Sequence, residues 1–215
     1  MANNCEIGLI ALREGGCGVH MSSLVKMQYF TAKYLGQYVD QPLKILDIGS
    51  QNVNGTYKQF FENLHWEYIG CDMEAGNNVD LVLKNVYDWK EIESDSIDVV
   101  ITGQTFEHIE YPWLTMLEIA RVLKTGGLCG IVAPASGPEH KYPVDCWRIY
   151  PDGFRALAKY AFLEVLEAFT EWNGKSYQDN SEIWCDSMLI AQKAVLTEED
   201  SRMFRMKSNL SKLTV

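Results

Sequence analysis

The chain has 215 residues, of which 47% are hydrophobic and 22% are charged, and these fractions exclude a disordered chain. A domain spans roughly 100–200 residues, so the length accommodates one domain with a short appendage. The 29 acidic residues outnumber the 19 basic ones and give a net charge of -10, which argues against binding to nucleic acid or to an anionic membrane surface.

The sequence lacks the hallmarks of a membrane or secreted protein. No apolar run approaches the roughly 20 residues that span a membrane, and residues 1–18 lack the pattern of a signal peptide. The six cysteines form no Cys-x-x-Cys pair and fit no zinc-ligand spacing. Several lie in apolar segments, where cysteine behaves as a small buried hydrophobe. We therefore expect a reduced, cytoplasmic protein with no membrane insertion.

Residues 1–21 are glycine-rich and weakly patterned, and we expect a loose lead-in or lid there. His20 would reach a functional site only as part of such a lid. Ser22 or Ser23 can cap a helix that follows. The apolar face of that helix consists of Leu24, Met27, Phe30, Tyr34, Leu35 and Tyr38.

Apolar strands and helices then alternate along the chain. Strands are expected at residues 43–48, 66–71, 79–83, 97–102, 128–133, 162–169 and 187–193, and helices at residues 56–63, 112–124 and 151–160. This alternation predicts an α/β fold: a Rossmann-like, doubly wound, mostly parallel seven-stranded sheet with helices on both faces. The domain is expected to span residues 22–195, and residues 196–215 to form a polar, frayed C-terminal tail.

Ligands of such sheets bind beyond the carboxyl ends of the strands. The first strand ends at Asp47 and Gly49, and the second ends in Asp72, a position from which a carboxylate accepts hydrogen bonds from a ribose. A dinucleotide-binding turn needs Gly-x-Gly-x-x-Gly, but Gln51 and Asn54 occupy the second and third glycine positions. Asp47 would also repel a pyrophosphate, whereas it suits an ammonium group such as that of S-adenosylmethionine. These features argue against a nicotinamide-dependent reductase.

Four segments resemble the motifs of class I S-adenosylmethionine-dependent methyltransferases. They are residues 46–50 (Leu-Asp-Ile-Gly-Ser), 69–73 (Ile-Gly-Cys-Asp-Met), 97–102 followed by Phe-Glu-His at 106–108, and 121–127 (Arg-Val-Leu-Lys-Thr-Gly-Gly). In the last of these, Thr125 stands where the family usually has proline. The similarity covers about residues 43–193, and the four motifs occur in the family's order and spacing.

The resemblance implies that the chain binds S-adenosyl-L-methionine and releases S-adenosyl-L-homocysteine. Asn85 stands where many members place an aspartate against the adenine amino group, and its carbonyl can still accept from that group. The cofactor-binding residues that the resemblance implies are Asp47, Gly49, Ser50, Asn54, Gly55, Asp72, Met73, Asn85, Val86, Thr102 and Gln104.

Residues 134–153 show a narrower resemblance, to small methyltransferases found beside glycosyltransferases in surface-polysaccharide gene sets. Such domains also occur inside larger glycan-building proteins, including viral ones, and the chain is compatible with an excised domain of that kind. The resemblance implies O-methylation of a sugar such as rhamnose, in a glycan or nucleotide sugar. The implied partners are the sugar or glycan acceptor and glycosyltransferase domains of the same pathway or polypeptide.

A hydroxyl acceptor must lose its proton, so a general base is expected near the carboxyl ends of the strands. His108 follows the fourth strand, and His140 and Asp145 lie in the loop after the fifth, so these three are the catalytic candidates. Glu107 is expected to accept hydrogen bonds from loop backbone. Asp145 is the one residue singled out that could help to hold a divalent metal, but no carboxylate cluster is evident, so a metal is not favoured.

Aromatic and polar residues of the same loop can bind a sugar: Tyr142, Trp147, Arg148 and Tyr150. Core packing of Trp147 and a salt bridge of Arg148 that ties the loop down are equally compatible with the sequence.

Two other functions remain open. One is methylation of a small-molecule or lipid-like acceptor, for which Trp147 and the loop tyrosines would form an apolar wall. The other is a non-catalytic module that binds S-adenosylmethionine, which the missing glycines and the missing adenine aspartate favour. Residues 103–106 (Gly-Gln-Thr-Phe) lack the Pro-Pro-aromatic segment of amino-directed DNA methylases, and no cysteine occupies the place of a cytosine-C5 nucleophile.

Overall fold

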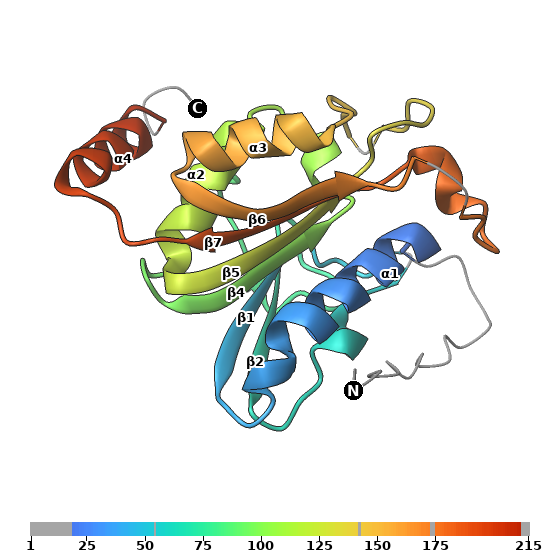
Figure 1. The fold of residues 1–215 in the computed structure, drawn as a ribbon, viewed down its shortest axis with the longest axis horizontal. Coiled ribbons are helices and arrows are strands. Elements are labelled where there is room, and N and C mark those ends of the chain that lie inside the picture. Colours follow the sequence, from blue (N-terminus) through green and yellow to red (C-terminus); the bar gives the residue numbers. More distant parts are fainter. Residues whose placement is uncertain (1–18, 54, 142, 173–174, 212–215) are drawn as a thin grey trace, which may run out of the picture.

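The computed structural model of the chain describes residues 19–53, 55–141, 143–172 and 175–211. Its seven strands form one sheet in the order β3-β2-β1-β4-β5-β7-β6 (Figure 1). The strands from β3 to β5 are parallel, and β7 runs antiparallel to both β5 and β6. The predicted Rossmann-like, mostly parallel seven-stranded sheet is confirmed. The strands are β1 (Leu43–Ile48), β2 (Trp66–Asp72), β3 (Leu81–Val82), β4 (Ile97–Gly103), β5 (Leu123–Ala133), β6 (Leu163–Thr170) and β7 (Ser187–Lys193).

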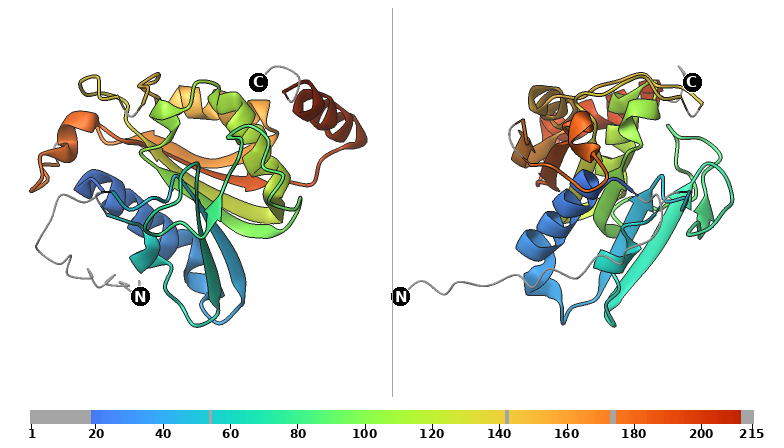
Figure 2. Two further views of the ribbon diagram at one scale, coloured as in Figure 1. Left: turned by 180° about the vertical axis from the view of Figure 1, so that it is seen from behind. Right: turned by 90° about the vertical axis from the view of Figure 1, so that its right-hand side faces the viewer.

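Helices cover both faces of this sheet because successive strand residues point to opposite sides. Ile45 and Ile101 belong to an apolar cluster with Phe30 of α1 (Met21–Phe30). Their neighbours Leu46 and Val100 belong to a second cluster, which includes α2 (Pro112–Val122) and α3 (Pro151–Tyr160). Figure 2 shows α1 on one side of the sheet and α2 and α3 on the other.

The topology places a crevice at the carboxyl ends of β1 and β4. From β1, the sheet grows through β2 and β3 in one direction and through β4 and β5 in the other. Asp47 of β1 is in register with Gly70 of β2 and with Ile101 of β4, so the three strand ends lie side by side. Such a reversal is where open α/β sheets bind their ligands.

The expected helix at residues 56–63 is a single short 3-10 turn, Lys58–Phe60. Tyr57 and Phe61 on either side of it are buried, and the Tyr57 hydroxyl is 2.6 Å from the Ser23 hydroxyl. Helix nucleation is costly in so short a segment. Burial of the two rings determines the local conformation instead. The expected strand at residues 79–83 is likewise reduced to Leu81–Val82.

Two helix boundaries also differ from the expectation. α1 begins at Met21, and neither serine caps it: the Ser22 hydroxyl donates to Asp186 and the Ser23 hydroxyl meets Tyr57. α1 continues through a π-helical turn (Thr31–Leu35) and a 3-10 turn (Gly36–Tyr38). α2 ends at Val122 rather than Lys124 because β5 begins at Leu123 and pairs with Ile97 there.

The expectation of a frayed tail was wrong, since helix α4 spans Glu198–Ser211. The Thr197 hydroxyl accepts the Asp200 backbone N–H at 3.1 Å, which caps the first turn. Phe204 packs against the core, and the Lys207 ammonium lies 4.1 Å from the centre of the Tyr160 ring. In the described part of the chain, no helix combines the length and apolar character needed to cross a membrane.

Candidate active site

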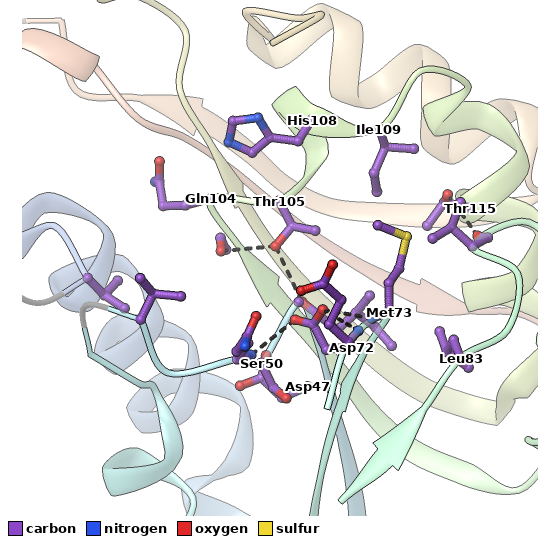
Figure 3. Close-up of a pocket in the computed structure, with 18 of the residues that line it drawn as sticks. Asp47, Ser50, Asp72, Met73, Leu83, Gln104, Thr105, His108, Ile109 and Thr115 are labelled. Carbon is purple, nitrogen blue, oxygen red and sulfur yellow. Dashed lines mark hydrogen bonds between the residues drawn. The ribbon is translucent and has the colours of Figure 1, made fainter. Parts of the chain in front are cut away.

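A cavity of about 550 Å³ opens beyond the carboxyl ends of β1, β2 and β4 (Figure 3). In this view His108 lies on one side and Asp47, Ser50 and Asp72 lie together on the opposite side, with Thr105 between them and His108. The structure brings ten of the predicted site residues into the lining. They are Asp47, Gly49, Ser50, Gly55, Asp72, Met73, Val86, Gln104, His108 and His140.

The turn after β1 requires glycine at one position. Gly49 has a positive φ of 74°, and a Cβ there would lie 2.2 Å from the Thr105 hydroxyl oxygen. The Gly49 backbone N–H donates to the Cys71 carbonyl at 2.8 Å. Ser50 is buried, and its hydroxyl donates to the Asn78 carbonyl at 2.8 Å. These contacts fix the turn at the edge of the cavity, where its backbone can come close to a ligand.

Asp72 ends β2 with its carboxylate organised by backbone amides. Its Oδ1 accepts the N–H groups of Met73 at 2.7 Å and Glu74 at 3.3 Å, and its Oδ2 accepts that of Gln51 at 3.1 Å. A carboxylate has about four acceptor sites, so one remains, on Oδ2. Asp72 can therefore accept a hydrogen bond from a ligand hydroxyl group.

Asp47 is a buried carboxyl at the floor of the cavity. The Tyr68 hydroxyl donates to it at 2.5 Å. Burial raises its pKa to about 7, and the nearby Asp72 carboxylate acts in the same direction, while the Tyr68 hydrogen bond opposes both. A cationic group of a ligand in the cavity would favour the ionised form of Asp47.

One end of the cavity is an apolar slot, suited to a flat ring. It is lined by Leu83, Val86, Tyr87, Trp89 and Ile109. Val86 is the only predicted cofactor residue in this group.

Two of the predicted cofactor residues lie outside the lining. The exposed Asn85 uses its side-chain carbonyl to accept the Tyr87 backbone N–H at 2.7 Å, so it shapes the turn instead of facing the slot. Thr102 is fully buried in β4, one residue before the chain reaches the cavity at Gly103.

Gln104 links the cavity to the residue that precedes β7. It has a positive φ of 56°, and its side-chain amide donates to Asp186 at 3.1 Å. Asp186 also accepts the Ser22 hydroxyl at 2.5 Å. The connection ties the β4 loop, the start of α1 and the start of β7 together around one side of the cavity.

His108 and His140 face each other beside the cavity, with ring centres 4.9 Å apart. Both approach the carboxylate of Glu107: the His108 Nε2 lies 3.7 Å and the His140 Nε2 3.9 Å from Glu107 Oε1. Burial lowers the pKa of His108, which keeps its ring neutral. Glu107 accepts the loop N–H groups of Cys146 at 2.7 Å and Trp147 at 3.2 Å, as expected, but with its backbone carbonyl; among the described residues neither of its carboxylate oxygens accepts a hydrogen bond.

Asp145 contacts the group formed by Glu107, His108 and His140 through the His140 ring. Its side chain is only 2% exposed, and its Oδ2 lies 3.5 Å from the His140 Nδ1. Arg148 donates to both carboxylate oxygens, at 2.6 and 2.8 Å, and holds the pKa of Asp145 well below its usual range. Asp145 is thus an ionised partner of Arg148 and His140, and it lies outside the cavity lining.

The three predicted sugar-binding residues of this loop that the structure describes do not line the cavity: Trp147, Arg148 and Tyr150. Arg148 is occupied by Asp145 and by the Pro138 carbonyl at 2.6 Å, which is the loop-tying salt bridge that the sequence left open. The Trp147 indole N–H donates to the Ile109 carbonyl at 2.9 Å. Tyr150 is 56% exposed and packs beside Trp172.

Three predictions fall wholly or partly outside the described residues. Asn54 and Tyr142 are not described, nor are residues 1–18 of the expected lid. Of the last residues of that segment, Val19 and His20 line the cavity. His20 stacks on Trp184, with ring centres 5.3 Å apart and an interplanar angle of 10°.

Sequence reasoning missed Tyr57, Thr105 and Trp184. Tyr57 and Thr105 line the cavity, and the Trp184 ring centre lies 4.8 Å from that of His140. Tyr57 follows the glycine-containing turn closely, which could have drawn attention to it. Trp184 comes from the β6–β7 connection, and no local signal in the sequence places it near residues 20 or 140.

Comparison with known proteins agrees with this geometry. Residues 46–131, about two fifths of the chain, match the family model described as a methyltransferase domain. This segment contains the end of β1, all of β2, β3, β4 and α2, and most of β5, and therefore most of the cavity lining. A search of curated proteins finds no match to the chain.

Solved structures show the same fold at low sequence identity. The 1,6-didemethyltoxoflavin-N1-methyltransferase of Burkholderia thailandensis has a TM-score of 0.60 and 13% identity, covering 81% of this chain and 79% of that one. A SAM-dependent methyltransferase of Methanosarcina mazei has a TM-score of 0.55 and 12% identity, covering 76% and 98%. The [4+2]-cyclase SpnF has a TM-score of 0.59 and 13% identity, covering 86% and 88%.

The fold, the cavity and the match over residues 46–131 agree with one another. The chain has the fold of class I S-adenosylmethionine-dependent methyltransferases, and its residues 46–131 match the model of a methyltransferase domain.

Proposed function

We propose that the chain transfers the methyl group of S-adenosyl-L-methionine to a hydroxyl group of a sugar, in a glycan or nucleotide sugar. The observation that carries this proposal is the position of His108 and His140. They line the same cavity as Asp47 and Asp72, which are suited to the cofactor.

The lining accommodates each part of the cofactor. The apolar slot around Val86 takes the adenine ring, and the free acceptor site of Asp72 takes a ribose hydroxyl. The buried Asp47 faces the ammonium group of the methionine part. This arrangement directs the sulfonium methyl group toward Gln104 and the histidines on the other side of the cavity.

Methyl transfer is an in-line displacement at carbon, and alignment supplies much of its rate enhancement. The acceptor oxygen forms the new C–O bond, and the electron pair of the breaking C–S bond stays on sulfur, which yields S-adenosyl-L-homocysteine. A sugar hydroxyl is a poor nucleophile until its proton is removed. The group formed by Glu107, His108 and His140 supports such an activation step.

A non-sugar acceptor is the alternative. The toxoflavin-type enzyme, by its name, methylates a ring nitrogen. A neutral nitrogen has its own lone pair and needs little help from a base, so the histidine and glutamate groups would then have no evident task. The name of SpnF indicates that this fold also carries a reaction other than methyl transfer, which leaves a non-methylating role as a further alternative.

The proposal also concerns where the acceptor comes from. A glycosyltransferase activity would supply it, as the resemblance of residues 134–153 implies.

The proposed compartment is the cytoplasm. Four cysteines are free thiols, which supports a reducing compartment of this kind: Cys71, Cys129, Cys146 and Cys185.

The test is transfer of labelled methyl from S-adenosylmethionine to rhamnose-, fucose- and mannose-type acceptors. We expect label in at least one sugar, as an ether that resists mild base. His140→Gln should abolish transfer and leave cofactor affinity intact, whereas His65→Gln, at an exposed histidine before β2, should do neither. Label found only on nitrogen or carbon acceptors would refute the sugar-hydroxyl proposal.

A further inference from the structure

Glu107 carries a buried carboxylate whose oxygens accept no hydrogen bond from the residues that the structure describes. It lies in the 3-10 turn Phe106–His108, and its side chain is fully buried. A carboxylate buried in this way is unfavourable unless it meets a proton or a cation.

Two imidazole nitrogens approach the same oxygen of this carboxylate. The Nε2 atoms of His108 and His140 lie 3.7 and 3.9 Å from Glu107 Oε1, and the three ligand atoms lie within 4.8 Å of one another. Ligands of a cation with bonds of about 2.1 Å stand roughly 3 Å apart. Small side-chain rotations would therefore bring the three atoms to bonding distance of one ion.

The other ring nitrogens are held as they are in metal sites. The His108 Nδ1 lies 2.6 Å from the Val144 carbonyl, which can only accept, so Nδ1 carries the proton. This contact leaves the His108 Nε2 with a free lone pair, and carbonyl partners of this kind orient many metal-binding histidines. The His140 Nδ1 lies 3.5 Å both from an Asp145 carboxylate oxygen and from an Arg148 guanidinium nitrogen, and these two groups hold the ring in place.

We propose that Glu107, His108 and His140 bind one divalent first-row transition-metal cation, whose open positions take two neighbouring hydroxyl oxygens of the acceptor. One carboxylate and two imidazoles suit Mn²⁺, Fe²⁺, Co²⁺ or Zn²⁺ better than Mg²⁺ or Ca²⁺, which prefer oxygen ligands alone. His140 is 37% exposed and both histidines line the cavity, so the cation faces the acceptor. The part of this proposal that concerns the acceptor hydroxyl oxygens rests on the proposed sugar methylation.

The cation would activate the acceptor by coordination. A hydroxyl bound to it loses its proton to water, because the cation lowers the pKa of the bound oxygen. The resulting alkoxide forms the C–O bond as the C–S bond breaks toward sulfur, and one proton is released for each methyl group transferred. The cation is neither oxidised nor consumed. A sugar with two adjacent hydroxyl groups is the acceptor class that chelates it.

The first experiment measures Mn²⁺ binding to the untagged, EDTA-treated full chain by titration calorimetry and by loss of the free Mn²⁺ electron-spin signal. We expect one equivalent to bind. Glu107→Gln and His140→Gln should each weaken binding by about 100-fold or more, since even outer-shell partners contribute about 10–100-fold. His65→Gln serves as the matched control and should bind as the wild type does.

Retained S-adenosylmethionine binding shows that each variant is folded. His140→Gln keeps the test decisive if Glu107→Gln does not fold, because His140 is partly exposed. No Mn²⁺ binding by the wild type would overturn the proposal, as would equal binding by His140→Gln and the wild type.

The second experiment separates the cation from the proposed function. We expect EDTA to abolish transfer to a sugar, and Mn²⁺ or Co²⁺ to restore it. Full transfer in EDTA would overturn the cation proposal and leave sugar methylation standing. Stoichiometric Mn²⁺ binding by a chain that methylates no sugar would support the cation site and refute the sugar acceptor.

Discussion

Asp47 links protein stability to cofactor binding through one buried carboxyl group. Its pKa is raised to about 7 by burial, from 3.8 in an exposed chain. With respect to this group, the folded protein is most stable below about pH 4, where the carboxyl is neutral in both the folded and the unfolded state. This stability is lost as the pH rises through 7, where the buried carboxyl ionises. At roughly 1.4 kcal/mol for each pKa unit, the ionised carboxyl costs the empty protein a few kcal/mol.

We therefore expect Asp47→Asn to stabilise the ligand-free protein at pH 8, by up to a few kcal/mol, and to have little effect at pH 4. Denaturant unfolding of both proteins across this pH range measures the difference. The same substitution should weaken S-adenosylmethionine binding, because the ammonium group loses its counter-charge. A stability difference that does not change with pH would contradict the assignment.

Gly49 is the second residue on which cofactor binding is expected to depend. Alanine there would have to adopt a φ of 74° and would meet Thr105 at 2.2 Å. We expect Gly49→Ala to weaken S-adenosylmethionine binding by roughly tenfold or more, since each loss of about 1.4 kcal/mol is a factor of ten. Gly36→Ala is the control, because nothing lies within 4 Å of a Cβ there. Equal cofactor affinity of the two variants, by calorimetry, would show that the turn does not approach the ligand.

The site residues that could be predicted were those whose positions depend on the local sequence alone. Asp47, Gly49 and Asp72 lie at strand ends, and the strands themselves are evident from apolar runs. Trp184 was not predictable, because its contacts with His20 and His140 join segments more than 40 residues apart. Contacts of that kind depend on the packing of the whole chain.

The loop between β5 and α3 is held by one buried ion pair. Asp145 and Arg148 carry it, with the Asp145 side chain 2% exposed. We expect Arg148→Ala to destabilise the protein by about 2–3 kcal/mol, because the His140 backbone N–H at 2.7 Å is then the main remaining partner of the buried carboxylate. Arg155→Ala, which breaks an exposed pair with the same spacing, should cost about 1 kcal/mol or less.

Chemical unfolding measures both variants. The double variant Asp145→Asn/Arg148→Ala should lose less stability than Arg148→Ala alone, since no charge is then left buried. If Arg148→Ala and Arg155→Ala have the same effect, the ion pair does not hold the loop.

Element boundaries show where sequence patterns were insufficient. β1 and β7 were predicted at their observed bounds, because each is a short segment rich in apolar residues. α4 was missed because its residues are mostly polar, although Thr197 and Asp200 formed a readable capping signal. The turn at Lys58–Phe60 was predicted as a longer helix because periodicity does not reveal that Tyr57 and Phe61, on either side of the turn, are both buried in one apolar cluster.

The whole molecule confirms the predicted sheet and brings the predicted strand ends to one cavity. This is because a parallel sheet that grows both ways from β1 leaves a crevice there. The acceptor side was less predictable. Glu107, His108 and His140 are brought together by a loop whose course depends on the Arg148 ion pair and on the Cys146 N–H to Glu107 carbonyl bond at 2.7 Å.

The central claim is that the cavity at the β1–β4 reversal binds S-adenosyl-L-methionine. Calorimetric titration of the purified chain with this compound, and separately with NAD, tests it most directly. The account predicts micromolar binding of S-adenosylmethionine, with S-adenosylhomocysteine competing, and no binding of NAD, because the turn at Gly49 lacks a pyrophosphate-binding helix start. Absence of S-adenosylmethionine binding at millimolar concentration, or binding of NAD in its place, would contradict the account.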